Sequence, residues 1–173
     1  MSESQPQTIR YRRAAAADAT ALAALGAAVW IATYCEQGVP IDYAEYVLVE
    51  FTPAKFAAMI AEAAEGPVGF IDLRLDARNE HLPDLRQAEV ARLHILDRFA
   101  RRGIGRALLQ LGHAAAAQAG ATALWLTMYS GNNRARAFYE ALGWRKVGNW
   151  AFTLANKSYP NDVLAITVAP AAL

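Results

Sequence analysis

A short run of arginines and glycines separates a segment that predicts a strand from a segment that predicts a helix. The strand is predicted over residues 90–96 and the helix over residues 106–119. The run consists of Arg101, Arg102, Gly103, Ile104, Gly105 and Arg106. Free N–H groups and the helix dipole attract anions to a helix N-terminus, and glycines let a phosphate approach the backbone closely. The sequence therefore predicts a phosphate-binding turn between a strand and a helix.

Three kinds of phosphate site compete for this turn. A dinucleotide-binding fingerprint, G-x-G-x-x-G, would need a third glycine where the chain has Leu108. The P-loop string G-x-x-x-x-G-K-S/T does not occur in the chain. The segment from Ala100 to Gly105 resembles the acetyl-CoA loop of the GNAT N-acetyltransferases, Gln/Arg-x-x-Gly-x-Gly/Ala, except that Ala100 takes the Gln/Arg position. Arg98 or Arg101 would supply the missing side chain, and the alternative is an ordinary helix start with a solvated basic face.

A second segment also resembles the GNAT family. A strand predicted over residues 124–129 is followed by a sequence similar to the family pattern N-x-x-A-x-x-F-Y-x-x-x-G-F/W. The matching positions are Asn132, Ala135, Phe138, Tyr139, Gly143 and Trp144. Ser130 or Asn132 would cap the helix, and Gly143 suits the left-handed residue that ends it.

The resemblance covers most of the chain and implies the α/β (α+β) GNAT fold, a mixed central sheet of about seven strands with about four helices. Residues 1–8 are expected to form a flexible tail, and residues 9–173 a single domain. Asp18 is expected to cap the first helix. The other expected elements are strands over 9–14 and 68–75, helices over 19–34 and 42–50, a polar loop over 77–86, and strands over 147–154 and 161–164. Residues 56–63 fit a strand or a helix, and the resemblance favours a strand. Segments 44–46, 51–56, 147–154 and 161–164 also resemble the PaiA-like polyamine acetyltransferases.

Composition excludes several classes of protein. The formal net charge is +1, whereas a general nucleic-acid binder has a clear basic excess. The basic residues instead gather around the predicted turn, as Arg92, Arg98, Arg101, Arg102 and Arg106. No apolar run approaches the roughly 20 residues of a membrane span, and the polar start lacks a signal core.

The cysteine and the histidines also limit the chemistry of the chain. Cys35 is the only cysteine, which fits a reducing cytoplasm and is more typical of a packed residue than of a reactive thiol. The three histidines have no metal-ligand spacing, so no metal is expected.

The resemblance implies transfer of an acetyl group from acetyl-CoA to a primary amine of a small molecule, a polyamine in the PaiA branch, by direct attack in a ternary complex. Cofactor contacts would come from the strand residues Leu93, His94 and Ile95 through their main chain, from Arg101 to Arg106, and from Asn132 and Phe138. Tyr139 would be the general acid that protonates the departing thiolate, and the alternative is an aromatic packing residue beside Phe138.

The general base has two candidates. Glu89 begins the fourth strand, where related enzymes place a carboxylate that acts through water, and the alternative is an exposed glutamate at a strand start. His94 titrates near neutral pH, but strand alternation directs its side chain away from the face of Leu93 and Ile95.

Three function classes remain open from the sequence. The first is the small-molecule N-acetyltransferase, for which Glu36, Asp42, Glu45 and Glu50 would suit a cationic amine, unless they are a solvated helix face. The others are a non-catalytic acyl-CoA sensor and a protein or peptide N-acetyltransferase. Dimers are common in the family, so the resemblance also admits a homodimer.

Overall fold

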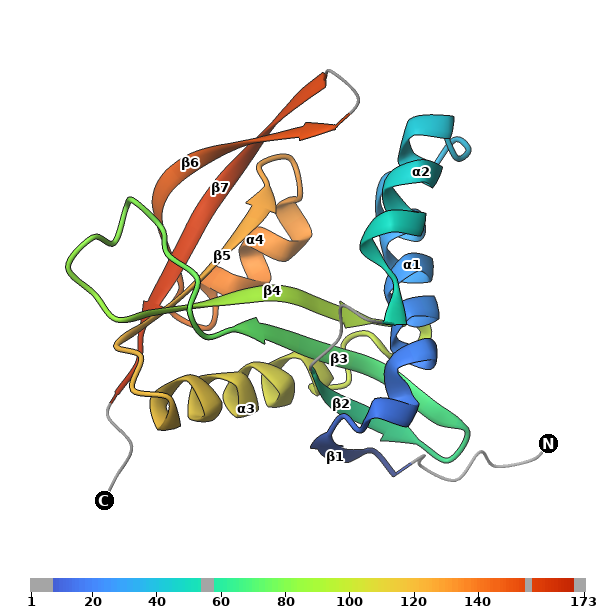
Figure 1. The fold of residues 1–173 in the computed structure, drawn as a ribbon, viewed down its shortest axis with the longest axis horizontal. Helices are drawn as coiled ribbons and strands as arrows, with labels where there is room; N and C mark the ends of the chain where they lie inside the picture. The colour runs from blue at the N-terminus through green and yellow to red at the C-terminus, as the bar shows by residue number, and fades with distance from the viewer. Residues whose placement is uncertain (1–7, 54–57, 155–156, 170–173) are drawn as a thin grey trace. The chain divides into compact units, whose positions relative to one another are not determined.

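The fold is known from a computed structural model that describes residues 8–53, 58–154 and 157–169 (Figure 1). Its seven strands form one mixed sheet with the order β1-β2-β3-β4-β5-β7-β6. Strands β4 and β5 pair in parallel, whereas the pairs β1–β2, β2–β3, β5–β7 and β6–β7 are antiparallel. The strands are β1 (Arg10–Arg13), β2 (Ala58–Ala63), β3 (Gly66–Arg74), β4 (Gln87–Ile95), β5 (Ala123–Tyr129), β6 (Arg145–Leu154) and β7 (Lys157–Thr167).

Four α-helices accompany the sheet, so the predicted fold class is confirmed. They are α1 (Ala19–Tyr34), α2 (Ile41–Glu50), α3 (Ile104–Gln118) and α4 (Asn133–Glu140), with short 3-10 turns η1 (Ala16–Asp18) and η3 (Asp97–Phe99). Helix α1 has the predicted bounds, whereas α3 begins two residues before the predicted residue 106. Most of the predicted tail, residues 1–7, lies outside the described residues, as do the first two residues of the strand predicted over 56–63.

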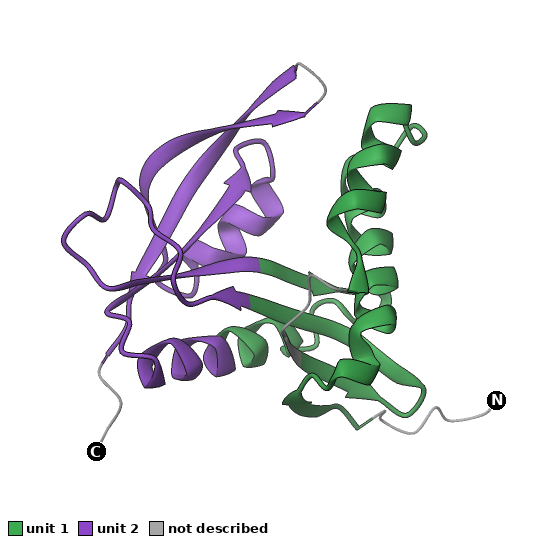
Figure 2. Ribbon diagram, in the orientation of Figure 1, with its two compact units in different colours: residues 1–72, 92–109 green, residues 73–91, 110–173 purple. Residues whose placement is uncertain are grey.

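The chain divides into two compact units (Figure 2). The first comprises residues 1–72 and 92–109, and the second comprises residues 73–91 and 110–173. Strands β3 and β4 and helix α3 each contribute residues to both units, because the unit boundaries fall inside them.

The core of the first unit forms where α1 packs on the sheet. Leu22 and Leu25 of α1 are buried against Ile60 of β2 and Phe70 of β3. Contrary to the expectation that no apolar run approaches the length of a membrane span, the helical segment Ala16–Tyr34 has 19 residues and a mean hydropathy of 1.5, which is long and apolar enough to cross a membrane. Core helices meet the same criterion, and the contacts of Leu22 and Leu25 are those of a helix packed on a sheet.

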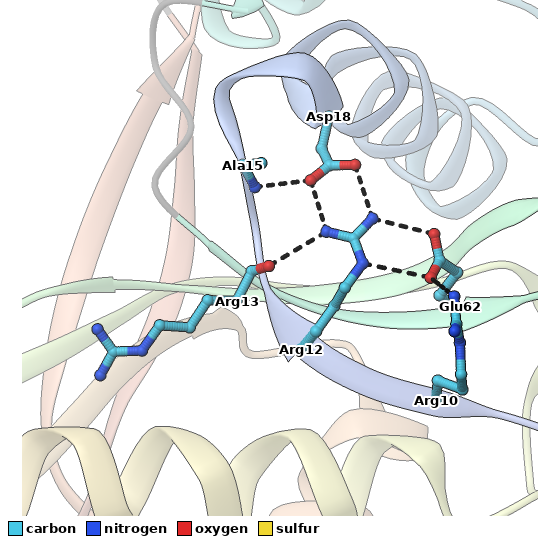
Figure 3. A network of polar contacts seen from close by, with 6 residues as sticks. All are labelled: Arg10, Arg12, Arg13, Ala15, Asp18 and Glu62. Atoms are coloured by element: carbon cyan, nitrogen blue, oxygen red, sulfur yellow. Dashed lines mark hydrogen bonds and ion pairs between the residues drawn. The ribbon is translucent and has the colours of Figure 1, made fainter.

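Arg12 links three elements at the start of the first unit (Figure 3). Its guanidinium binds Asp18 at 2.7 and 2.8 Å and Glu62 of β2 at 3.0 Å. Asp18 occupies the N-cap position of α1, as predicted, but its carboxylate makes no cap hydrogen bond to that helix. It binds Arg12 and accepts a hydrogen bond from the backbone N–H of Ala15, and these two interactions lower its pKa to about 2.

In the second unit, the predicted polar loop over 77–86 is partly buried. Ala77 and Leu82 pack on a core cluster that includes Trp125 of β5. The buried side chain of Gln87 accepts a hydrogen bond from the N–H of Asn79 at 2.6 Å. These contacts hold the loop against its own unit.

Candidate active site

The predicted phosphate-binding turn lies in the first unit, at the start of α3. The N–H of Ala107 donates to the carbonyl of Gly103 at 3.0 Å, so Gly103 is the N-cap residue of the helix. The N–H groups from Gly103 to Arg106 therefore have no partner within the helix. Arg101 and Gly103 have left-handed backbones, with φ of 61° and 78°. Alternation of left-handed and ordinary residues makes a concave row of N–H groups that binds anions.

The side chains of this turn divide into buried and exposed ones. Ile104 is 1% exposed, so only its backbone is available to a ligand. Arg101, Arg102 and Arg106 are exposed. The guanidinium of Arg102 lies 5.2 Å from the ring centroid of Phe99, and that of Arg98 lies 5.3 Å from it. The turn therefore combines free N–H groups with exposed positive charge, which fits a pyrophosphate such as that of CoA.

Arg92 does not belong to this exposed basic group, contrary to the prediction. Its side chain is 9% exposed and binds Asp72 at 2.7 Å and Glu50 at 3.2 Å. It also lies 5.6 Å from the ring centroid of Phe51. The charge of Arg92 is neutralised inside the first unit. Its side chain joins the end of α2 to strands β3 and β4.

The strand residues predicted to contact the cofactor, Leu93, His94 and Ile95, are also in the first unit. The ring of His94 lies 5.6 Å from that of Phe51 and 5.4 Å from that of Phe70. Its Nδ1 is buried and has no hydrogen-bond partner within the described part of the chain. Burial, reinforced by Arg92 and opposed by a hydrogen bond with the backbone of Gly26, lowers its pKa to about 4. An imidazole with this pKa is a weak base at neutral pH, which argues against His94 as the general base.

The His94→Leu variant should lose less stability in acid than the wild-type protein. The unfolded chain binds a proton at His94 near pH 6.5, whereas the folded protein binds it only near pH 4. Unfolding therefore takes up a proton between these values, and the wild-type free energy of unfolding should fall by about 3 kcal/mol as pH drops through this window. Urea unfolding at several pH values measures the difference, and parallel pH profiles for the two proteins would contradict the expectation.

Glu89 lies in the second unit, as the third residue of β4. Its side chain is 13% exposed, and its carboxylate binds Arg74 at 3.2 Å. It is thus not an exposed glutamate at a strand start. Its role as general base stays a prediction.

The other predicted residues of the second unit gather on α4. Asn132 is the N-cap, as predicted, and its Oδ1 accepts a hydrogen bond from the N–H of Ala135 at 3.0 Å. The ring of Tyr139 is 9% exposed and lies 5.1 Å from that of Phe138 and 5.5 Å from that of Trp144. Tyr139 is therefore packed among aromatic residues on both sides, and its role as general acid stays a prediction.

A buried carboxylate that the sequence did not indicate holds the start of α4. Asp162 of β7 is 1% exposed and binds Ser130 at 2.9 Å, Arg136 at 2.6 Å and Lys146 at 2.7 Å. Burial opposes ionisation, but the hydrogen bonds from Lys146 and Ser130 and the charge of Arg136 keep the pKa of Asp162 below its usual value. Asp162 thereby fixes the turn that carries Asn132. Its partners are scattered over three elements, so no local motif indicates it.

The predicted site residues thus form two groups, one in each unit. The first unit holds the three β4 residues and the basic turn, and the second holds Glu89, Asn132, Phe138 and Tyr139. Cys35 is half-buried, and desolvation raises the pKa of its thiol, so less of it is the reactive thiolate at neutral pH. Within residues 8–53, 58–154 and 157–169, no group of three or more His, Cys, Asp or Glu side chains could hold a metal ion.

Comparison with known proteins bears on the family and the fold of the chain. Residues 24–144 match the model of the acetyltransferase (GNAT) family. Among solved structures, PaiA N-acetyltransferase from Thermoplasma acidophilum, in complex with coenzyme A, is 16% identical to this chain with a TM-score of 0.69. The match covers 92% of this chain and 99% of the PaiA chain. NAA60 from Arabidopsis thaliana, in complex with acetyl-CoA, is 14% identical to this chain with a TM-score of 0.67. The match covers 93% of this chain and 100% of the NAA60 chain. Ard1 from Thermoplasma volcanium is 17% identical to this chain with a TM-score of 0.65. The match covers 93% of this chain and 98% of the Ard1 chain. At these identities the solved structures show a shared fold.

Proposed function

The chain belongs to the acetyltransferase (GNAT) family and is an acetyl-CoA-dependent N-acetyltransferase, and from this premise we propose that its acceptor is a primary amine of a small molecule. The turn before α3, where four N–H groups without a partner in the helix and exposed arginines lie together, supports the binding of acetyl-CoA. The small-amine acceptor is proposed on the resemblance of the sequence. Within the class of small amines we propose a polyamine, on the resemblance of segments 44–46 and 147–154 to that branch. The single cysteine supports a cytoplasmic location.

The proposed mechanism is direct attack by the amine in a ternary complex. Acetyl-CoA supplies an activated thioester. The N–H groups from Gly103 to Arg106 bind the pyrophosphate, and the main chain of residues 93–95 binds the pantetheine amides and polarises the acetyl carbonyl.

Two side chains move the protons in this mechanism. An alkyl ammonium has a pKa of about 10.4, so Glu89 accepts its proton through a water molecule before the nitrogen attacks. Tyr139 donates a proton to the thiolate as the C–S bond breaks. The ammonium nitrogen thus loses two protons. One goes to Glu89 before the attack, and one leaves after the C–N bond forms and replaces the proton that Tyr139 gives to the sulfur.

A thiol-release assay tests the proposal. Acetyl-CoA is supplied with spermidine, lysine-like amines, amino sugars or peptides, and the free thiol of CoA is measured over time. We expect turnover with small amines, and faster turnover with them than with peptides. Release with peptides alone would indicate a protein N-acetyltransferase. Binding of CoA without release for any amine would indicate a non-catalytic sensor.

A further inference from the structure

Helices α1 and α2 lie side by side in the first unit (Figures 1 and 2). Four of their aromatic side chains contact one another. The ring of Trp30 is 4.9 Å from that of Tyr34 on α1, and 5.4 and 5.1 Å from those of Tyr43 and Tyr46 on α2. We name these four residues the Trp30 cluster. Tyr34 is 41% exposed, so the cluster reaches the surface of the protein.

The surroundings of the Trp30 cluster are negatively charged. Residues 14–53 contain five acidic residues and no lysine or arginine. Asp18 and Glu50 are paired with arginines, but Glu36, Asp42 and Glu45 form no ion pair with any residue that the structure describes. Helix α1 ends at Tyr34 with no basic residue in its last turn, so the negative end of the helix dipole is not compensated there.

Aromatic faces and uncompensated negative charge attract the same kind of ligand, a desolvated organic cation. The face of an aromatic ring carries negative electrostatic potential, and tryptophan binds cations more strongly than tyrosine or phenylalanine does. The reacting amine loses its proton before it attacks, so a cation site holds it only until that step. A second amine of the same acceptor stays protonated throughout the reaction and suits such a site better.

We propose that the Trp30 cluster binds the protonated, non-reacting amine of a diamine or polyamine acceptor. This inference rests on the proposed function, since it concerns the acceptor of the same reaction, and it makes Trp30 and Tyr34 specificity-determining residues.

Both helices of the cluster are anchored on β4 within the first unit. Gly26, one turn before Trp30 on α1, makes a backbone hydrogen bond with the ring of His94. Phe51, the residue after α2, packs on the same ring, and Glu50 binds Arg92. The cluster is therefore carried by elements that are fixed to the strand proposed to hold the acetyl group, and this connection suits a site that selects the acceptor.

Calorimetry with two amines of matched chain length tests the inference. 1,4-Diaminobutane and n-butylamine are titrated into the full chain in the presence of saturating CoA. We expect the diamine to bind at least about fivefold more tightly than the monoamine, as one cation–π contact provides. Tyr34→Leu and Trp30→Leu should remove this preference, and Trp30→Phe should retain part of it.

Tyr11→Leu is the matched control, because Tyr11 is 39% exposed in β1 of the same unit but is not part of the cluster. It should keep the preference for the diamine. Equal affinity for the two amines, no diamine binding, or an unchanged preference in Tyr34→Leu would each overturn the inference. The thiol-release assay with n-butylamine distinguishes failure of this inference from failure of the proposed function, because acetylation of the monoamine needs no second cation.

Discussion

The Tyr139→Phe variant is expected to lower kcat at least tenfold, a loss of about 1.4 kcal/mol of transition-state stabilisation. The substitution removes the phenol that would protonate the departing thiolate, and keeps the ring that packs against Phe138 and Trp144. Because the ring contacts survive, the KM for acetyl-CoA should change little. Steady-state kinetics with the best amine from the thiol-release panel measure both quantities.

Tyr159→Phe provides a matched control for this experiment. Tyr159 lies in β7 of the same unit, and its ring centroid is 6.4 Å from that of Phe152. Loss of this hydroxyl should leave kcat close to the wild-type value. A wild-type rate in Tyr139→Phe would remove Tyr139 from the mechanism and leave it as an aromatic packing residue.

The Gly103→Val variant is expected to weaken CoA binding by more than about a hundredfold, which corresponds to roughly 2.8 kcal/mol. A Cβ atom at Gly103 would have nothing within 4 Å, so the new side chain would occupy the space through which a phosphate approaches the N–H groups. The φ of 78° also disfavours a β-branched residue and would shift the turn. Calorimetric titration with CoA measures the affinity, and thermal unfolding measures the cost to the fold.

Gly38→Val separates the steric blocking of the phosphate from the effect of backbone strain. Gly38 belongs to the same unit, has a φ of 129°, and likewise has nothing within 4 Å of an added Cβ atom. This variant should have the backbone strain of Gly103→Val and keep its affinity for CoA. Unchanged CoA affinity in Gly103→Val would exclude the turn as the pyrophosphate site.

The sequence predicted elements whose signals are local. Helix α1 was placed correctly, because an apolar helical pattern ends before Gly38 and Pro40. The cap by Asn132 was also correct, since a cap needs only the next three residues. The start of α3 was placed too late, because Gly105 has low helix propensity and yet lies in the first turn.

Features that depend on distant segments could not be predicted in this way. Asp18 lies at the cap position, but Arg12 and the N–H of Ala15 hold its carboxylate away from the helix. Strand alternation could not show that Phe51 and Phe70 enclose the ring of His94. The Trp30 cluster likewise depends on the packing of two helices, which periodicity alone does not determine.

The two arginines that lie on Phe99 affect how quickly an anion reaches the protein. Within the described residues neither Arg98 nor Arg102 forms an ion pair, so a phenyl ring holds each guanidinium without cancelling its charge. The resulting field extends over about one Debye length, about 8 Å at physiological ionic strength. Added salt should therefore slow the association of CoA while the rate of the chemical step stays constant, so ionic strength separates ligand capture from catalysis.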